Sequence, residues 1–279
     1  MSFIRNIPLF SGLTAMEKDA IISEGSIYSY PRKAALFRQG DPLTHFYVIC
    51  SGVVRLFHET PDGHDVTSHF RVAGDTVCTT DIFVSGGIHH THAVAVSDVT
   101  ALEFSVEWLR ESVRQYAAFS SNLLSILSRR THRLEVEVEN HTTMSAVQLV
   151  ACFLKRTCAI NGFNPQGFNL PYSKSLIASR LGMTLETLSR TFPKLRDLGI
   201  TVEGRQVVLH DLSYIERNVC AHCSAAEACD NCSNGDNCHL YKCGIQKTAY
   251  TGIFRKDDMG DTAKYKTTRF SSPATGFQA

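Results

Sequence analysis

The stretch SKSLIASRLGMTLETLSRTFPKLRDLGITVEGRQVVLH, residues 173–210, decides the fold of the C-terminal part of the chain. It holds two helical segments, SKSLIASRLGM and TLETLSRTFPKLRDLG, which are joined tightly through Gly182. Thr184 is a good N-cap for the second segment, and Glu186 is favourably placed in its first turn. ITVEGRQVVLH then predicts a two-strand hairpin that turns at residues 203–204. Helix, tight turn, helix and small hairpin form the pattern of a winged helix-turn-helix.

Upstream, residues 27–105 indicate short strands separated by turn residues. The dipeptide Asp62-Gly63 is a hairpin signal, and HAVAVSDVTALEF over residues 92–104 alternates between apolar and polar residues. Strands this short, separated by Gly and Asp, favour an antiparallel barrel or sandwich over a parallel sheet.

A long helix is predicted between these two parts. From about Val106 the apolar residues recur at spacings of three, four and seven, with charges between them. A stripe that runs for about thirty residues is more typical of a dimer seam than of a surface helix, so we expect a homodimer. The stripe consists of Phe119, Leu123, Ile126, Leu127, Leu134 and Val138.

Together these segments predict an α+β protein. We expect an antiparallel β-roll over residues 1–108, a dimerisation helix over 109–140 and the winged helix-turn-helix over 141–218. A cysteine-rich segment over 219–243 follows, and the polar, aperiodic residues 244–279 are expected to be largely disordered.

The overall charge limits the kind of partner. Lys and Arg number 28 against 27 Asp and Glu, so any contact with nucleic acid must come from a local basic patch. No apolar run approaches the eighteen or so residues of a membrane span, and the N-terminus has no signal-peptide core, so we expect a cytoplasmic protein without membrane contact. Phosphate-cradling Gly loops, nucleophile elbows and paired metal-binding helix motifs are also missing, so the sequence does not indicate an enzyme.

Six of the ten cysteines gather near the C-terminus, where CAHCSAAEACDNC over residues 220–232 holds four of them. In a reducing compartment such a cluster indicates metal binding or redox chemistry rather than disulfides. A set of soft thiolate ligands suits an iron–sulfur cluster or zinc, and a thiol switch is the third reading. The candidate ligands are Cys220, Cys223, Cys229, Cys232, Cys238 and Cys243. The remaining four cysteines, Cys50, Cys78, Cys152 and Cys158, are expected to be small buried thiols.

The chain resembles the CRP/FNR superfamily of bacterial transcription regulators over roughly residues 7–217. The resemblance rests on IPLFSGL, on FRQGD, FYVICSGVVRLF and DGHD, on the long helix and on the winged helix, in that order and spacing. It implies a β-roll of the cyclic-nucleotide-binding jelly-roll type, a dimerising helix, double-stranded DNA as ligand and RNA polymerase as protein partner.

Two details point to the FNR branch. GDTVCTTDIFVSGGIHHTHAVAV, residues 74–96, lacks both the Glu and the Arg that clamp the cyclic phosphate in nucleotide sensors of the superfamily, so cAMP is not expected as ligand. The stretch LETLSR matches the E-x-x-S-R arrangement of the FNR-type recognition helix at Glu186, Ser189 and Arg190, which implies palindromic sites with TTGA-type half-sites.

The chemistry of these residues agrees with that role. Glu186, Ser189 and Arg190 share one helix face, Arg can chelate guanine, and a carboxylate can accept from amino groups of cytosine or adenine. Pro193 should kink this helix beyond them. Further candidate DNA contacts are Thr184, Thr187, Ser173, Lys174 and Arg205, with phosphate contacts also expected from Arg180, Lys194 and Arg196.

The signal stays open at this point. FNR-type sensors hold a [4Fe-4S] cluster with N-terminal cysteines, but the first cysteine here is Cys50, whereas the spacing Cys220-x2-Cys223-x5-Cys229 repeats the FNR ligand spacing at the other end. The resemblance therefore favours a response to oxygen, nitric oxide or redox state. The alternatives are a haem- or ligand-sensing regulator with a structural zinc or thiol-switch tail, with GIHHTH (87–92) as haem or metal ligands or a plain polar loop, and, less favoured, an iron–sulfur oxidoreductase.

Overall fold

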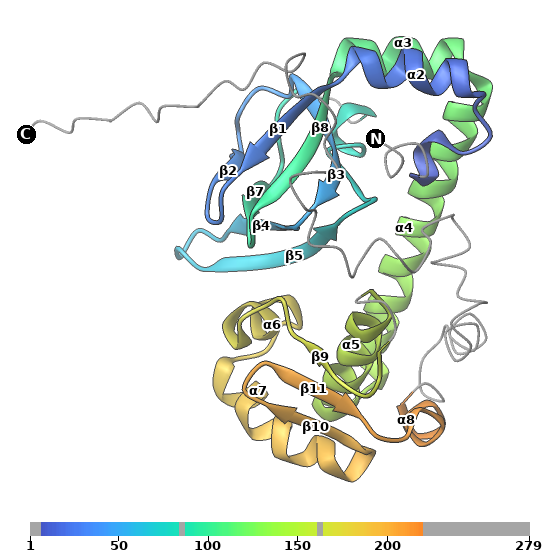
Figure 1. Cartoon of the computed structure of the whole chain (residues 1–279). Helices are drawn as coiled ribbons and strands as arrows, with labels where there is room; N and C mark the ends of the chain where they lie inside the picture. The colour runs from blue at the N-terminus through green and yellow to red at the C-terminus, as the bar shows by residue number, and fades with distance from the viewer. Residues whose placement is uncertain (1–6, 84–86, 161–163, 220–279) are drawn as a thin grey trace, which may run out of the picture.

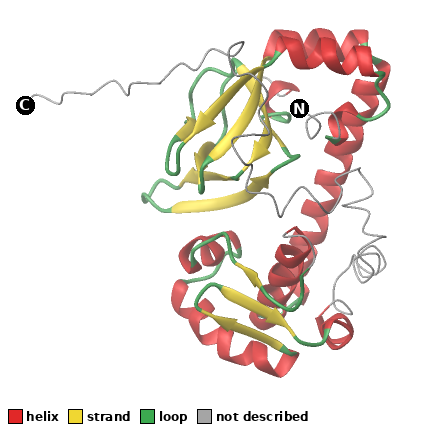
Figure 2. Ribbon diagram, viewed as in Figure 1, coloured by secondary structure: helices red, strands yellow, loops and turns green. Residues whose placement is uncertain are grey.

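The computed structural model describes residues 7–83, 87–160 and 164–219. Within these residues two four-stranded antiparallel sheets, with strand orders β1-β8-β3-β6 and β2-β7-β4-β5, form an N-terminal β-roll (Figures 1 and 2). The strands are β1 (Ser26–Tyr30), β2 (Ala35–Phe37), β3 (His45–Ser51), β4 (Val53–Glu59), β5 (Asp65–Val72), β6 (Thr76–Val77), β7 (His92–Ala95) and β8 (Val99–Ser105). The antiparallel prediction is thus confirmed. The predicted hairpin also forms, since β4 and β5 join at Gly63, whose φ of 80° suits glycine.

Helical segments cover one end of the β-roll. They are η1 (Pro8–Phe10), α2 (Ala15–Glu24) and α3 (Val106–Gln115), and a short 3-10 turn, η2 (Asp81–Phe83), lies between β6 and β7. Helix α2 was not predicted from the sequence, although Thr14 and Glu17 form a reciprocal capping box at its start.

The long helix differs from the single helix predicted over residues 109–140. Extended backbone at Tyr116 separates α3 from α4 (Ala117–Thr143), so the long helix begins later and bends away from α3. The bend lets both helices bury apolar residues in the same core, Leu109 from α3 and Phe119 from α4. Phe119 stacks on Phe10 at 6.4 Å and meets Trp108 edge-on at 5.9 Å, which fixes α4 to the β-roll.

The C-terminal part is a winged helix-turn-helix, as predicted. Its elements are α5 (Ala146–Ile160), β9 (Phe168–Asn169), α6 (Lys174–Arg180), α7 (Leu185–Thr191), η3 (Phe192–Leu198), β10 (Ile200–Glu203), β11 (Gln206–Leu209) and α8 (Leu212–Val219). Gly182, at φ 62°, makes the tight turn between α6 and α7, and Gly204, at φ 61°, makes the turn of the wing. The sheet has a third strand, β9, in the order β10-β11-β9, which was not predicted from the sequence.

The two parts touch along β5 and α6, while α4 runs along one side from the β-roll to the winged helix (Figure 1). Phe70 of β5 stacks on Tyr172, just before α6, with ring centroids 4.0 Å apart. Phe70 and Val53 pack against the core of the winged helix rather than that of the β-roll. None of the described helices is long and apolar enough to cross a membrane.

Candidate functional site

Helix α7 presents the predicted base-reading residues to solvent. Its inner face buries Leu188 and Thr191 against the domain core, so the opposite face, with Glu186, Ser189 and Arg190, is exposed. Glu186 and Arg190 form an i,i+4 ion pair whose side chains are 72% and 77% exposed. A pair this exposed contributes little to stability, about 0.3 to 0.5 kcal/mol. Either group can therefore leave its partner and bind a ligand instead.

Both helices of the motif begin at capped N-termini. Thr184 accepts a hydrogen bond from the backbone N–H of Thr187 at 3.1 Å, and Ser173 accepts one from Leu176 at 3.3 Å. Next to Ser173, Lys174 lies over the Phe192 ring at 5.0 Å while remaining exposed. The start of α6 and the start of α7 therefore both present polar groups, with N–H dipoles that favour phosphate.

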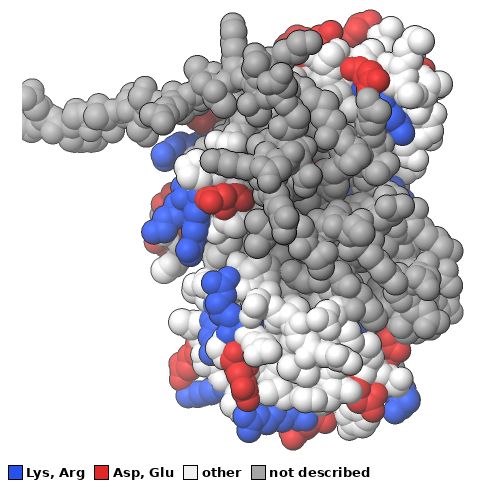
Figure 3. All heavy atoms as spheres, viewed as in Figure 1, with Lys and Arg blue, Asp and Glu red and all other residues white. Residues whose placement is uncertain are grey.

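The wing supplies a third predicted contact. The side chain of Arg205 donates through Nε and Nη2 to the carbonyl of Leu170, at 3.0 and 2.8 Å, which anchors the turn of the wing to the chain before α6. Lys194 and Arg196 are exposed on η3. Figure 3 shows Lys and Arg along the edge of this domain, interspersed with Asp and Glu, so the basic patch is local and moderate.

Pro193 acts differently from the prediction. The α-helix stops at Thr191, and the chain continues as the 3-10 helix η3 with Pro193 in its first turn, instead of kinking inside a longer α-helix. The change of helix type follows from proline, which lacks the N–H that would bond to Ser189. Glu186, Ser189 and Arg190 lie before the change, on regular α-helix.

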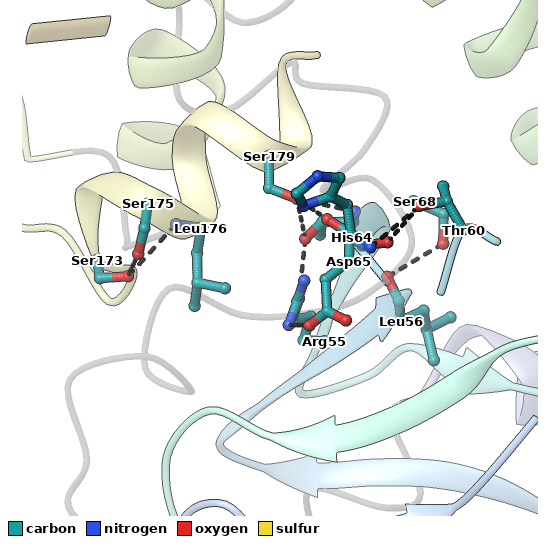
Figure 4. A network of polar contacts seen from close by, with 11 residues as sticks. Arg55, Leu56, Thr60, His64, Asp65, Ser68, Ser173, Ser175, Leu176 and Ser179 are labelled. Atoms are coloured by element: carbon teal, nitrogen blue, oxygen red, sulfur yellow. Dashed lines mark hydrogen bonds and ion pairs between the residues drawn. The ribbon is translucent and has the colours of Figure 1, made fainter. Parts of the chain in front are cut away.

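A network of polar contacts joins the β-roll to α6 (Figure 4). The Ser179 hydroxyl donates to the carbonyl of Asp65 at 3.1 Å and lies 2.9 Å from Oγ1 of Thr67, and it accepts from the Thr67 N–H at 3.0 Å. Arg55 of β4 completes the network by donating to Thr67 and to the Asp65 carboxylate. Helix α6 is thus hydrogen-bonded to the β4–β5 hairpin.

A second link runs through α4. Glu137 of α4 accepts from Arg180 of α6 at 2.5 Å and from Arg156 of α5 at 3.4 Å. Glu137 and Arg180 are only 17% and 16% exposed. Burial would raise the pKa of Glu137, but Arg180 and Arg156 hold that pKa below its usual value. Burial and the cations Arg71 and Arg180 lower the pKa of nearby His69 to about 3, so His69 is neutral at pH 7. Arg180, predicted to contact phosphate, is committed to Glu137 here.

The β-roll holds a buried cluster of ligand-type side chains. One ligand atom from each of Cys78, Asp81 and His89 lies within 4.8 Å of the other two, and Cys78 Sγ is 3.4 Å from Nδ1 of His89. Cys78 and His89 are 7% and 2% exposed. Burial and Asp81 raise the pKa of the Cys78 thiol, and burial lowers the pKa of His89 to about 4.

Arg130 connects this cluster to the long helix. Its guanidinium donates to Oγ1 of Thr79, next to Cys78, at 2.6 Å, and to both the carbonyl and the hydroxyl of Thr76. Arg71 of β5 is also buried, and its Nε has no hydrogen-bond partner among the described residues. Arginines from β5 and α4 thus approach the cluster, although residues 74–96 themselves contain no Lys or Arg.

Comparison with known proteins identifies both parts. The family model described as the cyclic nucleotide-binding domain matches residues 27–116, and that of the Crp-like helix-turn-helix domain matches residues 148–217. The chain belongs to the CRP/FNR superfamily of DNA-binding transcription regulators.

Individual CRP/FNR relatives agree with this assignment. The transcriptional activator protein anr of Pseudomonas aeruginosa is 29% identical over 188 residues, 65% of this chain and 74% of the relative. The fumarate and nitrate reduction regulatory protein of Escherichia coli is 26% identical over 180 residues, 63% of this chain and 71% of that protein. Both are named as regulatory proteins rather than enzymes. The structure of FixK2 from Bradyrhizobium japonicum has the same fold, with a TM-score of 0.62 at 23% identity over 70% of this chain and 96% of that one.

The cysteines and the candidate histidine ligands of this CRP/FNR protein fall into three groups. Cys220, Cys223, Cys229, Cys232, Cys238 and Cys243 lie outside the described residues, as does the tail over 244–279. The four single cysteines are buried, as expected. Of the histidines in GIHHTH, His89 is buried, His90 is exposed and His92 stacks on Phe57.

The Cys78–Asp81–His89 cluster and the contacts of Glu137 and Arg130 were not predicted from the sequence. Each joins residues on different elements, so no local spacing marked them. The one available signal was Cys78 beside a histidine-rich stretch in the same predicted domain.

Proposed function

We propose that the protein is an FNR-type regulator that binds palindromic DNA sites with TTGA-type half-sites as a homodimer, in the cytoplasm, and that it contacts RNA polymerase. The exposed face of α7 with Glu186, Ser189 and Arg190 carries this proposal. Arg190 would chelate a guanine, and Glu186 would accept from an amino group of a neighbouring base. Thr184, Thr187, Ser173, Lys174 and Arg205 would hold the backbone on either side.

An exposed apolar seam on α4 supports the homodimer. Leu124, Leu134 and Val138 are 66%, 44% and 66% exposed, although they are large and apolar. With Leu127 and Thr131 they follow spacings of three, four, three and four, the repeat by which two parallel helices pack together. Pairing along this seam would place two α7 helices symmetrically, as a palindromic site requires.

The contacts between the domains suggest how a signal reaches the DNA. Helix α4 carries the seam, and it also carries Arg130, bonded to the β-roll, and Glu137, bonded to Arg180 of α6. A change in the β-roll or in the packing of α4 would therefore move α6 and, through the tight turn at Gly182, the recognition helix α7.

Oxygen, nitric oxide or redox state is the proposed signal, with the C-terminal cysteines as ligands of a [4Fe-4S] cluster. Zinc held by the same cysteines is the alternative. Both rest on the spacing of the cysteines, and the name of the fumarate and nitrate reduction regulatory protein fits a respiratory signal.

The test is DNA binding by the full chain. Fluorescence anisotropy would use a duplex with two inverted TTGA half-sites about 10 bp apart centre to centre, and a scrambled duplex of equal composition. We expect the palindrome to bind about a thousandfold more tightly, in a salt-dependent way, and its affinity to change when anaerobic protein is exposed to air or nitric oxide. Equal affinity for both duplexes would contradict the proposal, and an affinity unchanged by air and nitric oxide would remove its sensory part.

A further inference from the structure

We infer that Cys78, Asp81 and His89 form a binding site for one divalent transition-metal ion of the zinc type, inside the β-roll and separate from the C-terminal cysteines. The three donors are a thiol sulfur, a carboxylate oxygen and an imidazole nitrogen, which are all established zinc ligands. Three protein donors would leave a fourth position of a tetrahedral ion open to water or to a small exogenous ligand.

The distances fit an ion of that size. Bond lengths of about 2.3 Å to sulfur and 2.0 Å to nitrogen at a tetrahedral angle place the two donors roughly 3.5 Å apart. Cys78 Sγ and His89 Nδ1 are separated by 3.4 Å. A carboxylate oxygen of Asp81 lies within 4.8 Å of a ligand atom of each of the other two residues. We expect an ion to draw the Asp81 carboxylate inward, since Asp81 is the least buried of the three.

The backbone and the packing hold the donors in place. Cys78 adopts a φ of 69°, a left-handed backbone conformation that strains a non-glycine residue and is found at functional positions. His89 stacks on Phe37 with ring centroids 3.7 Å apart. Its backbone N–H donates to Asp41, and its carbonyl accepts from Gly40, so ring and main chain are both fixed.

The charges balance when an ion binds. Binding would release the thiol proton to solvent as the metal–sulfur bond forms. One thiolate, one carboxylate and a divalent ion then sum to zero, so the donors themselves neutralise the ion that they hold.

The site adjoins the long helix. Arg130 of α4 donates to Thr79, the residue after Cys78, and to Thr76, two residues before it. An ion that moves Cys78 would therefore shift the anchor of α4. This second step rests on the proposed function, in which α4 carries the signal to the DNA-binding domain, whereas the metal site itself does not.

The test uses cobalt(II), which reports thiolate ligation through near-ultraviolet charge-transfer absorption. The full-length chain, with each of the six C-terminal cysteines replaced by serine, would be titrated with cobalt. We expect one ion per chain, displaced by zinc, and loss of the charge-transfer band in Cys78→Ser. Asp81→Asn should keep the band but bind about tenfold more weakly. The matched control is Cys50→Ser, another buried β-roll thiol, which should change nothing.

Two further measurements keep the outcomes distinct. If Cys78→Ser fails to fold by circular dichroism, His89→Gln replaces it, and a folded His89→Gln protein that binds cobalt as tightly as its parent would overturn the site. So would a parent chain that takes up no cobalt. Zinc should also change the affinity of this six-serine parent chain for the TTGA palindrome. In the same chain with Arg130→Met, zinc should leave that affinity unchanged. Bound metal with unchanged DNA affinity would refute the link to α4 alone, while a failure to bind DNA in any form would refute the proposed function and leave the cobalt result standing.

Discussion

Two glutamate–arginine pairs in this molecule have the same chemistry and opposite surroundings. Glu137 and Arg180 are 17% and 16% exposed and connect α4 to α6, whereas Glu186 and Arg190 are 72% and 77% exposed on the outer face of α7. The largely buried pair has lost most of its water, so removing one partner leaves the charge of the other poorly solvated. The exposed pair keeps its water and costs little to separate. Burial therefore makes one pair a structural link and leaves the other free to read DNA.

The largest expected effect comes from the buried pair. Glu137→Gln should lower the free energy of unfolding by about 2 to 3 kcal/mol, because Arg180 and Arg156 lose their carboxylate partner. Urea denaturation measures the change. Glu186→Gln, the matched change in the exposed pair, should cost less than about 0.5 kcal/mol. Equal losses in the two variants would mean that burial does not distinguish the two pairs.

The same pair predicts a pH dependence. Despite burial, which acts in the opposite direction, Arg180 and Arg156 hold the pKa of Glu137 below its ordinary value of 4.5. Its contribution to stability is thus complete above pH 4.5 and is lost as the pH falls through the lowered pKa. Glu137→Gln should flatten this part of an acid-unfolding curve.

Next in size is the effect of the exposed pair on DNA binding. Arg190→Ala should weaken binding to a TTGA palindrome by about 1 to 3 kcal/mol, roughly fivefold to 150-fold, because a bidentate contact to guanine is lost. Its unfolding free energy should stay within about 0.5 kcal/mol of the parent. A large loss of stability would mean that Arg190 is structural after all.

Glu103 of β8 is a third carboxylate to set beside the two pairs, because it is partly buried without a paired Lys or Arg among the described residues. Burial raises the pKa of Glu103 from 4.5 to about 7, although the hydrogen bond from Tyr30 acts in the other direction. Its protonated form favours folding, so the contribution is greatest below pH 4.5 and is lost as the pH rises to 7. Glu103→Gln should remove this decline and stabilise the protein at pH 8 by about 1 kcal/mol, after allowance for partial exposure. A variant less stable than the parent at pH 8 would argue against a raised pKa of Glu103.

The smallest expected effect concerns the hydroxyl between the domains. Ser179→Ala removes hydrogen bonds to Asp65 and Thr67 and should cost about 1 kcal/mol. Hydrogen–deuterium exchange should become faster in β5 and α6, while Ser175→Ala, an exposed position on the same helix, should leave exchange in β5 unchanged. Unchanged exchange in both variants would mean that the polar network around Ser179 does not hold the domains together.

The winged helix was predictable because its signals are local. Thr184, Gly182 and the 203–204 turn each act within a few residues, and a recognition helix keeps its chemistry on the surface, where a short motif describes it. Helix α2 could have been predicted in the same way from the capping box of Thr14 and Glu17, although it was not. The break at Tyr116 was not, because it follows from how two helices share one core.

The remaining features depend on the tertiary fold. Glu137 and Arg180 are 43 residues apart in the sequence, and Cys78 and His89 are brought together by a β-roll whose turns no spacing rule specifies. A single cysteine among apolar residues was correctly predicted to be buried, but its neighbours could not be read from the sequence. For the same reason the position of the cations Arg71 and Arg130 near the cluster was not predicted.

The most direct measurement pairs a change in the DNA with a change in α7. The guanine of both TTGA half-sites would be replaced by adenine, and the affinities of both duplexes would be measured for the parent and for Arg190→Ala at the same salt concentration. We predict that the parent loses at least about tenfold on the altered duplex while Arg190→Ala barely distinguishes the two, because the arginine reads that base. Equal discrimination by both proteins would contradict the account, since the guanine would then be read by another residue or not at all.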